Sequence, residues 1–443
     1  MGTMPVGKLI ISMSLPMVAS MLFQAVYNIV DSIFVAKLNQ DAMNAVSLAF
    51  PFQSLVIAFA GGTGVGMNAL LSRFLGQKDN DGADRVANTG IFLYICTAVV
   101  FSIIGFFAAE PYFKILTDNP GIISYGKDYL TVCIGFCYAI FGQMCSERLL
   151  QSTGRTDLAM IPQIIGAVFN MIFDPILIFG LLGFPRLEVL GAAIATACGQ
   201  VLATVIGFIL NVKKNPEIHL SLKKIRFHRE TAAGIYKIAV PSIVLQAVGS
   251  FTNFIINNIL IGFTEAATAA YGAYYKIQSF VFLPVIGLNN AVVPIVSYNY
   301  GAKHSDRVKE SVKLGIFIAV GIMTFGTICF ELIPSLLLKM FSPTEEMLRV
   351  GTVAFRIIGV HFPLAGFCIV AGSVCQALGK PLYSLINSLC RQVVVLLPVL
   401  YLLSLTGNLD LVWLAFPISE LVSLTLSSIF LKKTLTVLKS PEE

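Results

Sequence analysis

Two aspartates lie inside long apolar stretches of this chain, where a charged side chain is costly. Asp31 is part of YNIVDSIFVA (residues 27–36), and Asp174 is part of NMIFDPILIFG (residues 170–180). An ionised carboxylate at the centre of a membrane span costs about 2.5–3.5 kcal/mol on insertion scales, so such residues usually have a function. Two buried carboxylates share a proton readily, and their oxygens also suit hard cations. The pair therefore predicts a site for H⁺ or Na⁺.

Three further polar residues lie where they could complete this site. Tyr27 precedes Asp31 by one helical turn, and Asn170 precedes Asp174 by one turn, so each pair shares a helix face. At 1.5 Å per residue, Asp31, Asp174 and Thr196 all lie roughly 8–12 Å below the same membrane surface. We expect these five residues to form one cation-coupling site. If the ion is Na⁺, its expected ligands are Asp31, Asn170, Asp174 and Thr196. The alternative is that the five residues only satisfy one another.

Composition shows what kind of element must hold these residues. The chain has 443 residues, of which 56% are hydrophobic and only 12% are charged. A soluble domain carries about 25% charged residues. Because hydrocarbon tolerates only backbones that satisfy their own hydrogen bonds, long apolar stretches of this kind predict an all-α polytopic membrane protein.

Polar breaks divide the chain into twelve apolar segments, each long enough to span a bilayer. We expect spans at 9–36, 45–72, 88–109, 127–150, 158–182, 189–212, 235–263, 267–297, 312–334, 350–377, 381–405 and 411–431.

Basic residues alternate between the two sides of these spans. They are abundant after the second span (Arg73, Lys78, Arg85), across 213–237, across 303–313, and in the tail (Lys432, Lys433, Lys439). The intervening loops carry few. The positive-inside rule therefore places both termini in the cytoplasm, and we expect a multi-pass protein of the plasma membrane.

The two halves of the sequence repeat at a constant offset of 225 residues. Pro16 aligns with Pro241, Asn28 with Asn253, and Gln53 with Gln278. Six spans per half give both halves the same orientation, and parallel repeats of this kind are a transporter architecture. We expect an N-terminal lobe (1–212), a cytoplasmic linker (213–234) and a C-terminal lobe (235–443). Pro16 is the expected hinge of the first span, since proline cannot donate its backbone hydrogen bond.

Other polar or flexible side chains inside the spans are candidates for a substrate cavity. They are Met21, Asn28, Gln53, Lys276 and Gln278. Lys276 and Glu420 lie at similar depths, which favours a structural ion pair between them. The roles of Arg356 and Arg391 stay open.

Several motifs together resemble the multidrug and toxic compound extrusion (MATE) family. They are LP (15–16), YNIVD (27–31), AVSLAFP (45–51), LLQSTGRT (149–156), NMIFDPILIFG (170–180) and GAAIATA (191–197). The resemblance covers essentially the whole chain. It implies two six-helix lobes that alternate between outward and inward openings and export amphipathic, mostly cationic compounds against H⁺ or Na⁺. In the branch with a first-lobe cation site, Tyr27, Asp31, Asn170, Asp174 and Thr196 match the motif positions.

The sequence leaves two alternatives to a drug antiporter. A flippase for a lipid-linked saccharide would favour a cationic cavity, and the basic residues of the second half keep it open. An enzyme is disfavoured, because the sequence has no Ser/His dyad and no metal-binding cluster. We expect no cofactor beyond the coupling ion, no nucleic-acid partner, contact with the lipid bilayer, and a monomer. The residues do not separate H⁺ from Na⁺.

Overall fold

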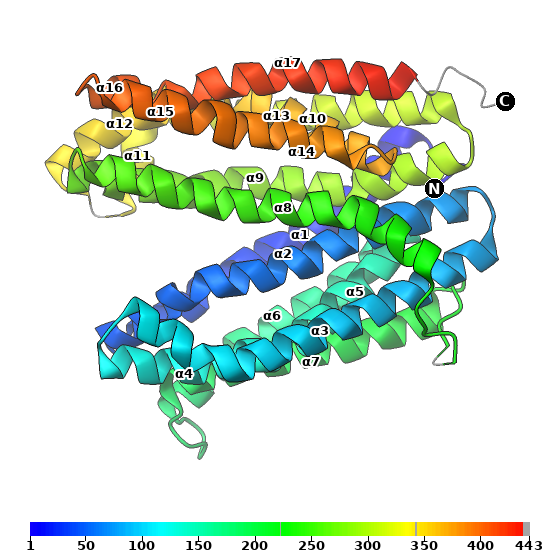
Figure 1. Ribbon diagram of the computed structural model, residues 1–443, viewed down its shortest axis with the longest axis horizontal. Coiled ribbons are helices and arrows are strands. Elements are labelled where there is room, and N and C mark those ends of the chain that lie inside the picture. Colours follow the sequence, from blue (N-terminus) through cyan, green and yellow to red (C-terminus); the bar gives the residue numbers. More distant parts are fainter. Residues whose placement is uncertain (222, 342, 437–443) are drawn as a thin grey trace. The chain divides into compact units, whose positions relative to one another are not determined.

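The computed structural model describes residues 1–443 except 222, 342 and 437–443, and within that described part all regular structure is helical (Figure 1). The expected all-α fold is confirmed, although tail residue Lys439 lies outside the described residues. The helices are α1 (Val6–Ala36), α2 (Gln40–Gly76), α3 (Asn80–Leu116), α4 (Pro120–Gly135), α5 (Tyr138–Ser152), α6 (Thr156–Phe179), α7 (Glu188–Lys214), α8 (Arg229–Ile261), α9 (Glu265–Gly301), α10 (Ser305–Leu332), α11 (Pro334–Lys339), α12 (Glu345–Gly359), α13 (Phe362–Ala377), α14 (Pro381–Leu389), the π-helix η1 (Cys390–Leu396), α15 (Leu397–Ser404), α16 (Leu409–Val412) and α17 (Ala415–Thr436).

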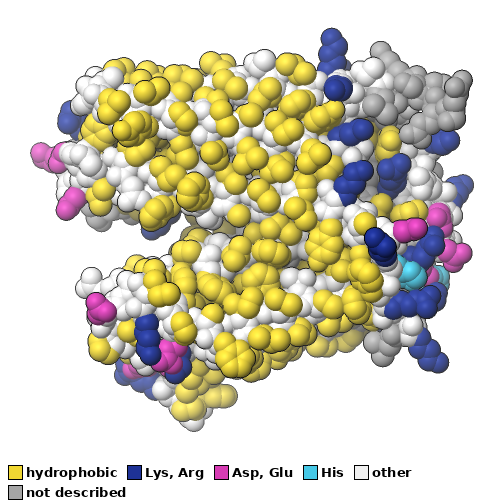
Figure 2. Space-filling model, viewed as in Figure 1, with side chains coloured by type: hydrophobic (Ala, Val, Ile, Leu, Met, Phe, Trp, Pro, Cys, Tyr) yellow, Lys and Arg dark blue, Asp and Glu magenta, His cyan; other side chains and the backbone are white. Residues whose placement is uncertain are grey.

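Ten helical segments among the described residues are long and apolar enough to cross a membrane. Two bent pairs, α4 with α5 (40°) and α12 with α13 (48°), bring the number to twelve when each pair is one span. Twelve spans is the number expected from the sequence. Figure 2 shows apolar side chains covering the middle of the helices, with charged side chains near the helix ends. This distribution suits a multi-pass membrane protein, since apolar surface faces lipid and charges stay near water.

The helix boundaries repeat at the offset of 225 residues that the sequence predicted. Helix α2 (Gln40–Gly76) corresponds in this way to α9 (Glu265–Gly301) at both of its ends. Helix α6 (Thr156–Phe179) corresponds at both ends to the continuous segment Pro381–Ser404, which comprises α14, η1 and α15. The duplication therefore extends to the start and end of individual helices.

Local contacts repeat at the same offset. The Ser72 hydroxyl donates to the carbonyl of Ser152 (2.9 Å), and the Ser297 hydroxyl donates to the carbonyl of Ala377 (3.2 Å). The turns after α2 and α9 each contain a lysine at φ +59°, Lys78 and Lys303. A non-glycine residue in this left-handed region is uncommon, so its recurrence indicates that the two turns are built alike.

The compact units of the structure differ from the predicted lobes in one respect. One unit comprises Met1–Val18 with Val244–Glu443, and the other comprises Ala19–Ile243. Helices α1 and α8 therefore each belong to both units. Each helix changes unit two residues after a proline, which is Pro16 in α1 and Pro241 in α8. The predicted boundaries at 212 and 235 follow the sequence repeat, whereas packing assigns the first half of each repeat's first helix to the other unit.

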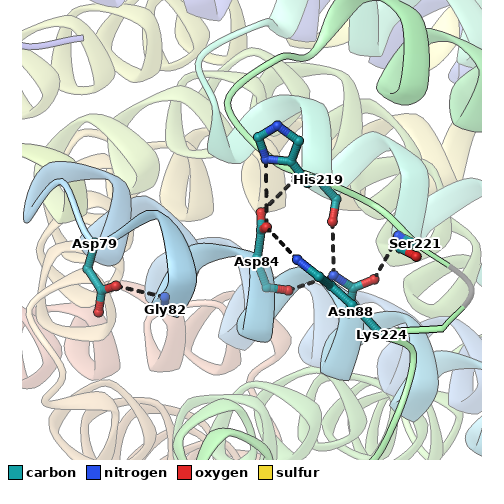
Figure 3. A network of polar contacts seen from close by, with 7 residues as sticks. All are labelled: Asp79, Gly82, Asp84, Asn88, His219, Ser221 and Lys224. Carbon is teal, nitrogen blue, oxygen red and sulfur yellow. Dashed lines mark hydrogen bonds and ion pairs between the residues drawn. The ribbon is translucent and has the colours of Figure 1, made fainter.

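The linker after α7 is attached to α3 of its own unit by a polar network (Figure 3). The carboxylate of Asp84 accepts from the backbone N–H of His219 (2.7 Å) and lies 3.4 Å from Nζ of Lys224. The Asn88 amide donates to the His219 carbonyl (3.2 Å) and accepts from the Ser221 backbone N–H (3.3 Å). Two side chains one turn apart on α3 thus hold the described part of the linker.

Candidate functional site

Two glycines bring the helices of the site together. A Cβ atom on Gly166 of α6 would lie 3.0 Å from the carbonyl oxygen of Gly199 on α7, and one on Gly199 would lie 2.8 Å from the carbonyl oxygen of Gly166. The two backbones therefore touch at this level, as small residues allow in membrane helices. Asn170 lies one turn after Gly166 on α6, and Thr196 lies one turn before Gly199 on α7. The close contact of the two helices therefore brings Asn170 beside Thr196.

Asn170 joins the two helices through its amide. With the amide oriented so that both of its atoms have matching partners, Nδ2 donates to Oδ2 of Asp174 (2.8 Å). Its Oδ1 accepts from the backbone N–H of Thr196 (3.1 Å) and from the Thr196 hydroxyl (2.9 Å). Asp174 itself is fully buried. A buried carboxylate needs such donors, because leaving it without them costs several kcal/mol, on the order of 3–5.

Asp31 of α1 completes the group from the other side. Its carboxyl group lies next to that of Asp174, close enough for the two acids to share a proton. Its Oδ1 is buried and has no hydrogen-bond partner among the described residues. Tyr27, one turn earlier on α1, lies near both acids and hydrogen-bonds with Gln24. The structure therefore brings together all five residues that the sequence grouped.

A cavity of about 330 Å³ opens beside this group within the same unit. Asp31, Asn170 and Thr196 line it, as do Asn28 and Gln53, which were expected to line a substrate cavity. Met21 is not among its lining residues. Polar and apolar side chains line the cavity in similar numbers, a combination that suits an amphipathic small molecule.

Sequence reasoning missed several polar residues of this cavity. Gln163 donates to Gln24 (2.7 Å), which links α6 to α1. Gln53 donates to the hydroxyl of Tyr129 (3.4 Å). Glu147, an acid inside a span that the sequence did not assign to a cavity, also lines it and accepts from Gln143 (2.9 Å). Unlike Gln53, Gln24 and Gln163 align with no glutamine in the other repeat, so no sequence pattern marked them.

The candidates in the second half of the chain are not part of this cavity. Gln278 lines a separate cavity of about 230 Å³ in the other unit. The expected pair of Lys276 with Glu420 is wrong: Glu420 pairs with Nη1 of Arg391 at 3.0 Å, while Nζ of Lys276 lies over the ring of Phe341. Similar depth placed Lys276 and Glu420 at one level, but depth does not determine which helix faces meet.

The first site offers carboxyl groups and neutral oxygens as possible ligands. Among the described residues, no group of three or more His, Cys, Asp or Glu is arranged to hold a metal ion. Two carboxyl groups with neutral oxygens from Thr196 and Tyr27 could hold Na⁺ or a shared proton.

The fold and site define a helical membrane transporter built from two parallel repeats, each with a polar cavity inside its helices. The chain belongs to the MatE family, whose model matches residues 16–176 and again residues 241–402. The two matches begin at Pro16 and Pro241, which is the offset of the internal repeat. Members of this family are transporters, so the chain is not an enzyme.

Relatives and solved structures agree with this assignment. The chain is 26% identical over 423 residues to the FAD transporter of Shewanella oneidensis, covering 94% of this chain and 92% of that protein. It is 26% identical over 411 residues to the multidrug export protein MepA of Staphylococcus haemolyticus, covering 92% and 89%. A MOP superfamily transporter from Pyrococcus furiosus superposes with a TM-score of 0.92 at 25% identity, covering 98% and 97%. An outward-facing multidrug resistance MATE family transporter matches with the same values.

Proposed function

We propose that this protein exports amphipathic, mostly cationic small molecules, driven by inward movement of H⁺ or Na⁺ through its first-lobe site. The observation that carries the proposal is the pair of Asp31, which lines the cavity, and Asp174, which is buried beside it. The similarity to the multidrug export protein MepA supports drug-like cargo. Membership of the branch with a first-lobe cation site belongs to this proposal.

In this arrangement the coupling ion and the cargo bind to the same acid pair. Asp31 faces the cavity and touches Asp174, so a cationic cargo near Asp31 competes with a proton or Na⁺ for the same negative charge. Each elementary charge that moves inward across the membrane releases about 2.3 kcal/mol per 100 mV. Exchange at one acid pair therefore couples the ion gradient to expulsion of cargo.

Alternating access would require the two units to move, and α1 and α8 are the helices they share. A proline inside a helix removes one backbone hydrogen bond and bends the helix easily. Pro16 and Pro241 lie directly before the points where these helices change unit. They are the proposed hinges.

The proposal includes a location and an assembly state. Basic residues at one set of helix ends favour cytoplasmic termini in a plasma membrane, and a single chain contains both repeats. We expect a monomer. The family match does not favour a flippase for lipid-linked saccharides.

The test is efflux of a fluorescent cation from vesicles that contain the purified protein. A pH gradient and a Na⁺ gradient are imposed separately, and the gradient that drives efflux identifies the ion. Asp31→Asn and Asp174→Asn are expected to reduce gradient-driven efflux at least about tenfold, since each removes a charge on which coupling depends.

The matched control is Asp81→Asn, an exposed aspartate in the first turn of α3 that lies outside the cavity. It should retain wild-type efflux. Full gradient-driven efflux by Asp31→Asn would exclude the proposed coupling site.

A further inference from the structure

The second cavity is the repeat counterpart of the first. Adding the offset of 225 residues takes Asn28 and Gln53 of the first cavity to Asn253 and Gln278, and both of these line the second. The duplication that produced two bundles therefore also produced the same cavity twice, once in each unit.

The charges of the two cavities differ. The offset takes Tyr27 to Thr252 and Asp31 to Ile256, so the second cavity has lost the acid of α1 and its neighbouring tyrosine. In their place it contains Arg391 and Glu420, which form an ion pair of 3.0 Å, together with His361. A carboxylate that is already neutralised by a guanidinium is a poor site for a cation.

The ion pair leaves groups free for a ligand. Glu420 lines the cavity and is almost fully buried. Its Oε1 has no hydrogen-bond partner among the described residues. Only one N–H of Arg391, at Nη1, is used in the pair, so other guanidinium donors lie next to this acceptor. Side by side, the two residues present a donor and an acceptor.

The backbone at this point is itself unusual. Arg391 lies in η1, a π-helix, whereas the corresponding residues around Gly166 in the first repeat are ordinary α-helix. A π-helical turn inserts extra backbone without ending the helix, and such turns are frequent at functional sites. Here it accompanies a long basic side chain at the position that glycine occupies in the other repeat.

Aromatic rings form another part of the cavity wall. Tyr271 and Tyr274 stack at a centroid distance of 5.8 Å, and Phe416 lies 6.1 Å from each of them. The Tyr271 hydroxyl donates to Asn253 (2.6 Å), which orients its ring. Flat rings favour a flat ligand that can stack on them or meet their edges.

We propose that the second cavity binds planar heterocycles whose edge carries an N–H donor beside a carbonyl acceptor, as in lactams and imides. The N–H donates to Oε1 of Glu420, the carbonyl accepts from the Arg391 guanidinium, and the ring packs against Tyr271 and Tyr274. The protein thus has two binding sites of different chemistry, an acidic one in the first repeat and a charge-neutral one in the second.

The probe is lumiflavin, a fluorescent planar ring system with an imide edge, titrated into the purified full-length protein in detergent. Saturable fluorescence change is expected. 3-Methyllumiflavin, in which the imide N–H is replaced by N–CH₃, should bind at least about tenfold more weakly, because a hydrogen bond to a buried charged acceptor is lost. Equal binding of the two compounds, or no saturable binding of lumiflavin, overturns the proposal without any variant.

A charge-balanced double variant, Arg391→Met with Glu420→Met, tests the location. Replacing a buried ion pair by apolar side chains commonly preserves folding, which thermal unfolding will check. The double variant should lose lumiflavin binding about tenfold or more, whereas Asp31→Asn, in the first cavity, should bind lumiflavin as the wild type does. Undiminished binding by the double variant, or loss of binding in Asp31→Asn, places the ligand elsewhere and overturns the proposal. Lumiflavin binding is measured without an ion gradient, so a failure of the cation-export assay would not change the outcome of this test.

Discussion

At the scale of single residues, the candidate site depends on how a buried acid is satisfied. Asp174 is fully buried and accepts from Asn170, which in turn is held by the backbone and hydroxyl of Thr196. Asp31 retains one buried carboxylate oxygen with no partner among the described residues. The group thus combines one well-held acid with one acid that has capacity for a proton or an ion.

This arrangement predicts unequal effects for two neutral substitutions. Thr196→Val removes one of two donors to Asn170 and should cost about 0.5–1.5 kcal/mol in ion affinity, a few-fold shift in the gradient needed for half-maximal efflux. Asn170→Ala removes the donor to Asp174 and should cost about 1.5–3 kcal/mol, a shift of tenfold or more. Efflux from vesicles at graded ion gradients measures both.

A matched hydroxyl outside the cavity provides the control. Thr97 on α3 donates to the carbonyl of Leu93 in its own helix (2.8 Å) and does not line the cavity. Thr97→Val should leave the ion dependence unchanged. A larger effect from Thr196→Val than from Asn170→Ala would contradict the hydrogen-bond assignment described here.

At the scale of elements, α3 does more than cross the membrane. Its first turns carry Asp84 and Asn88, which hold the linker through backbone and side-chain contacts. Asp84 also lies near the positive end of the α3 dipole, which favours a carboxylate there. The linker that joins the two repeats is therefore attached to the unit that contains the acidic site.

Asp84→Ala should release this attachment at a cost of about 1–3 kcal/mol, because the backbone N–H of His219 and the Lys224 ammonium both lose their acceptor. The exposed lysines of the linker, Lys223 and Lys224, should then be cut by trypsin faster than in the wild type. Limited proteolysis of the purified protein measures the rate.

Asp81→Ala removes an exposed acid from the same turn of α3 and should leave the cleavage rate unchanged. Equal cleavage of Asp84→Ala and the wild type would show that the linker is held by other contacts.

At the scale of the whole molecule, two helices, α1 and α8, each have residues in both compact units. The exchange of units in α1 and α8 occurs two residues after Pro16 and Pro241, at corresponding positions of the two repeats. The proposed alternating access requires movement of one unit relative to the other, and α1 and α8 are the helices with described residues in both units.

Pro16→Ala restores a backbone donor and removes a steric clash, which stabilises a straight helix by as much as about 3 kcal/mol. Transport should therefore slow about tenfold while thermal stability is maintained or increases. The rate of fluorescent-cation efflux and the unfolding temperature are measured on the same preparation. Pro241→Ala should act in the same direction.

Pro111 provides a matched control because it lies inside α3, which belongs to a single unit, and is exposed. Pro111→Ala should leave the transport rate near that of the wild type. An equal loss in Pro111→Ala and Pro16→Ala would indicate general sensitivity of the helices to proline rather than a hinge at the unit boundary.

The sequence by itself predicted the helical spans, their approximate ends, the duplication and a common level for the acids. Each of these follows from properties that run along the chain: apolar length against bilayer thickness, a constant offset between repeats, and the rise per residue of a helix. Depth counting was sufficient to group Asp31, Asp174 and Thr196, because a helix fixes position along its axis.

Only the tertiary structure decided which helix faces meet, which helices change unit, and what the second cavity contains. The sequence paired Glu420 with Lys276 by depth, but the rotation of each helix about its axis, set by packing, gave it Arg391. For the same reason, the sequence did not show that α1 and α8 each belong to both units, because a boundary that is defined by packing does not appear in the hydropathy pattern. The position of a residue along its helix axis follows from the sequence of that helix, whereas the direction in which its side chain points around the axis depends on how the neighbouring helices pack.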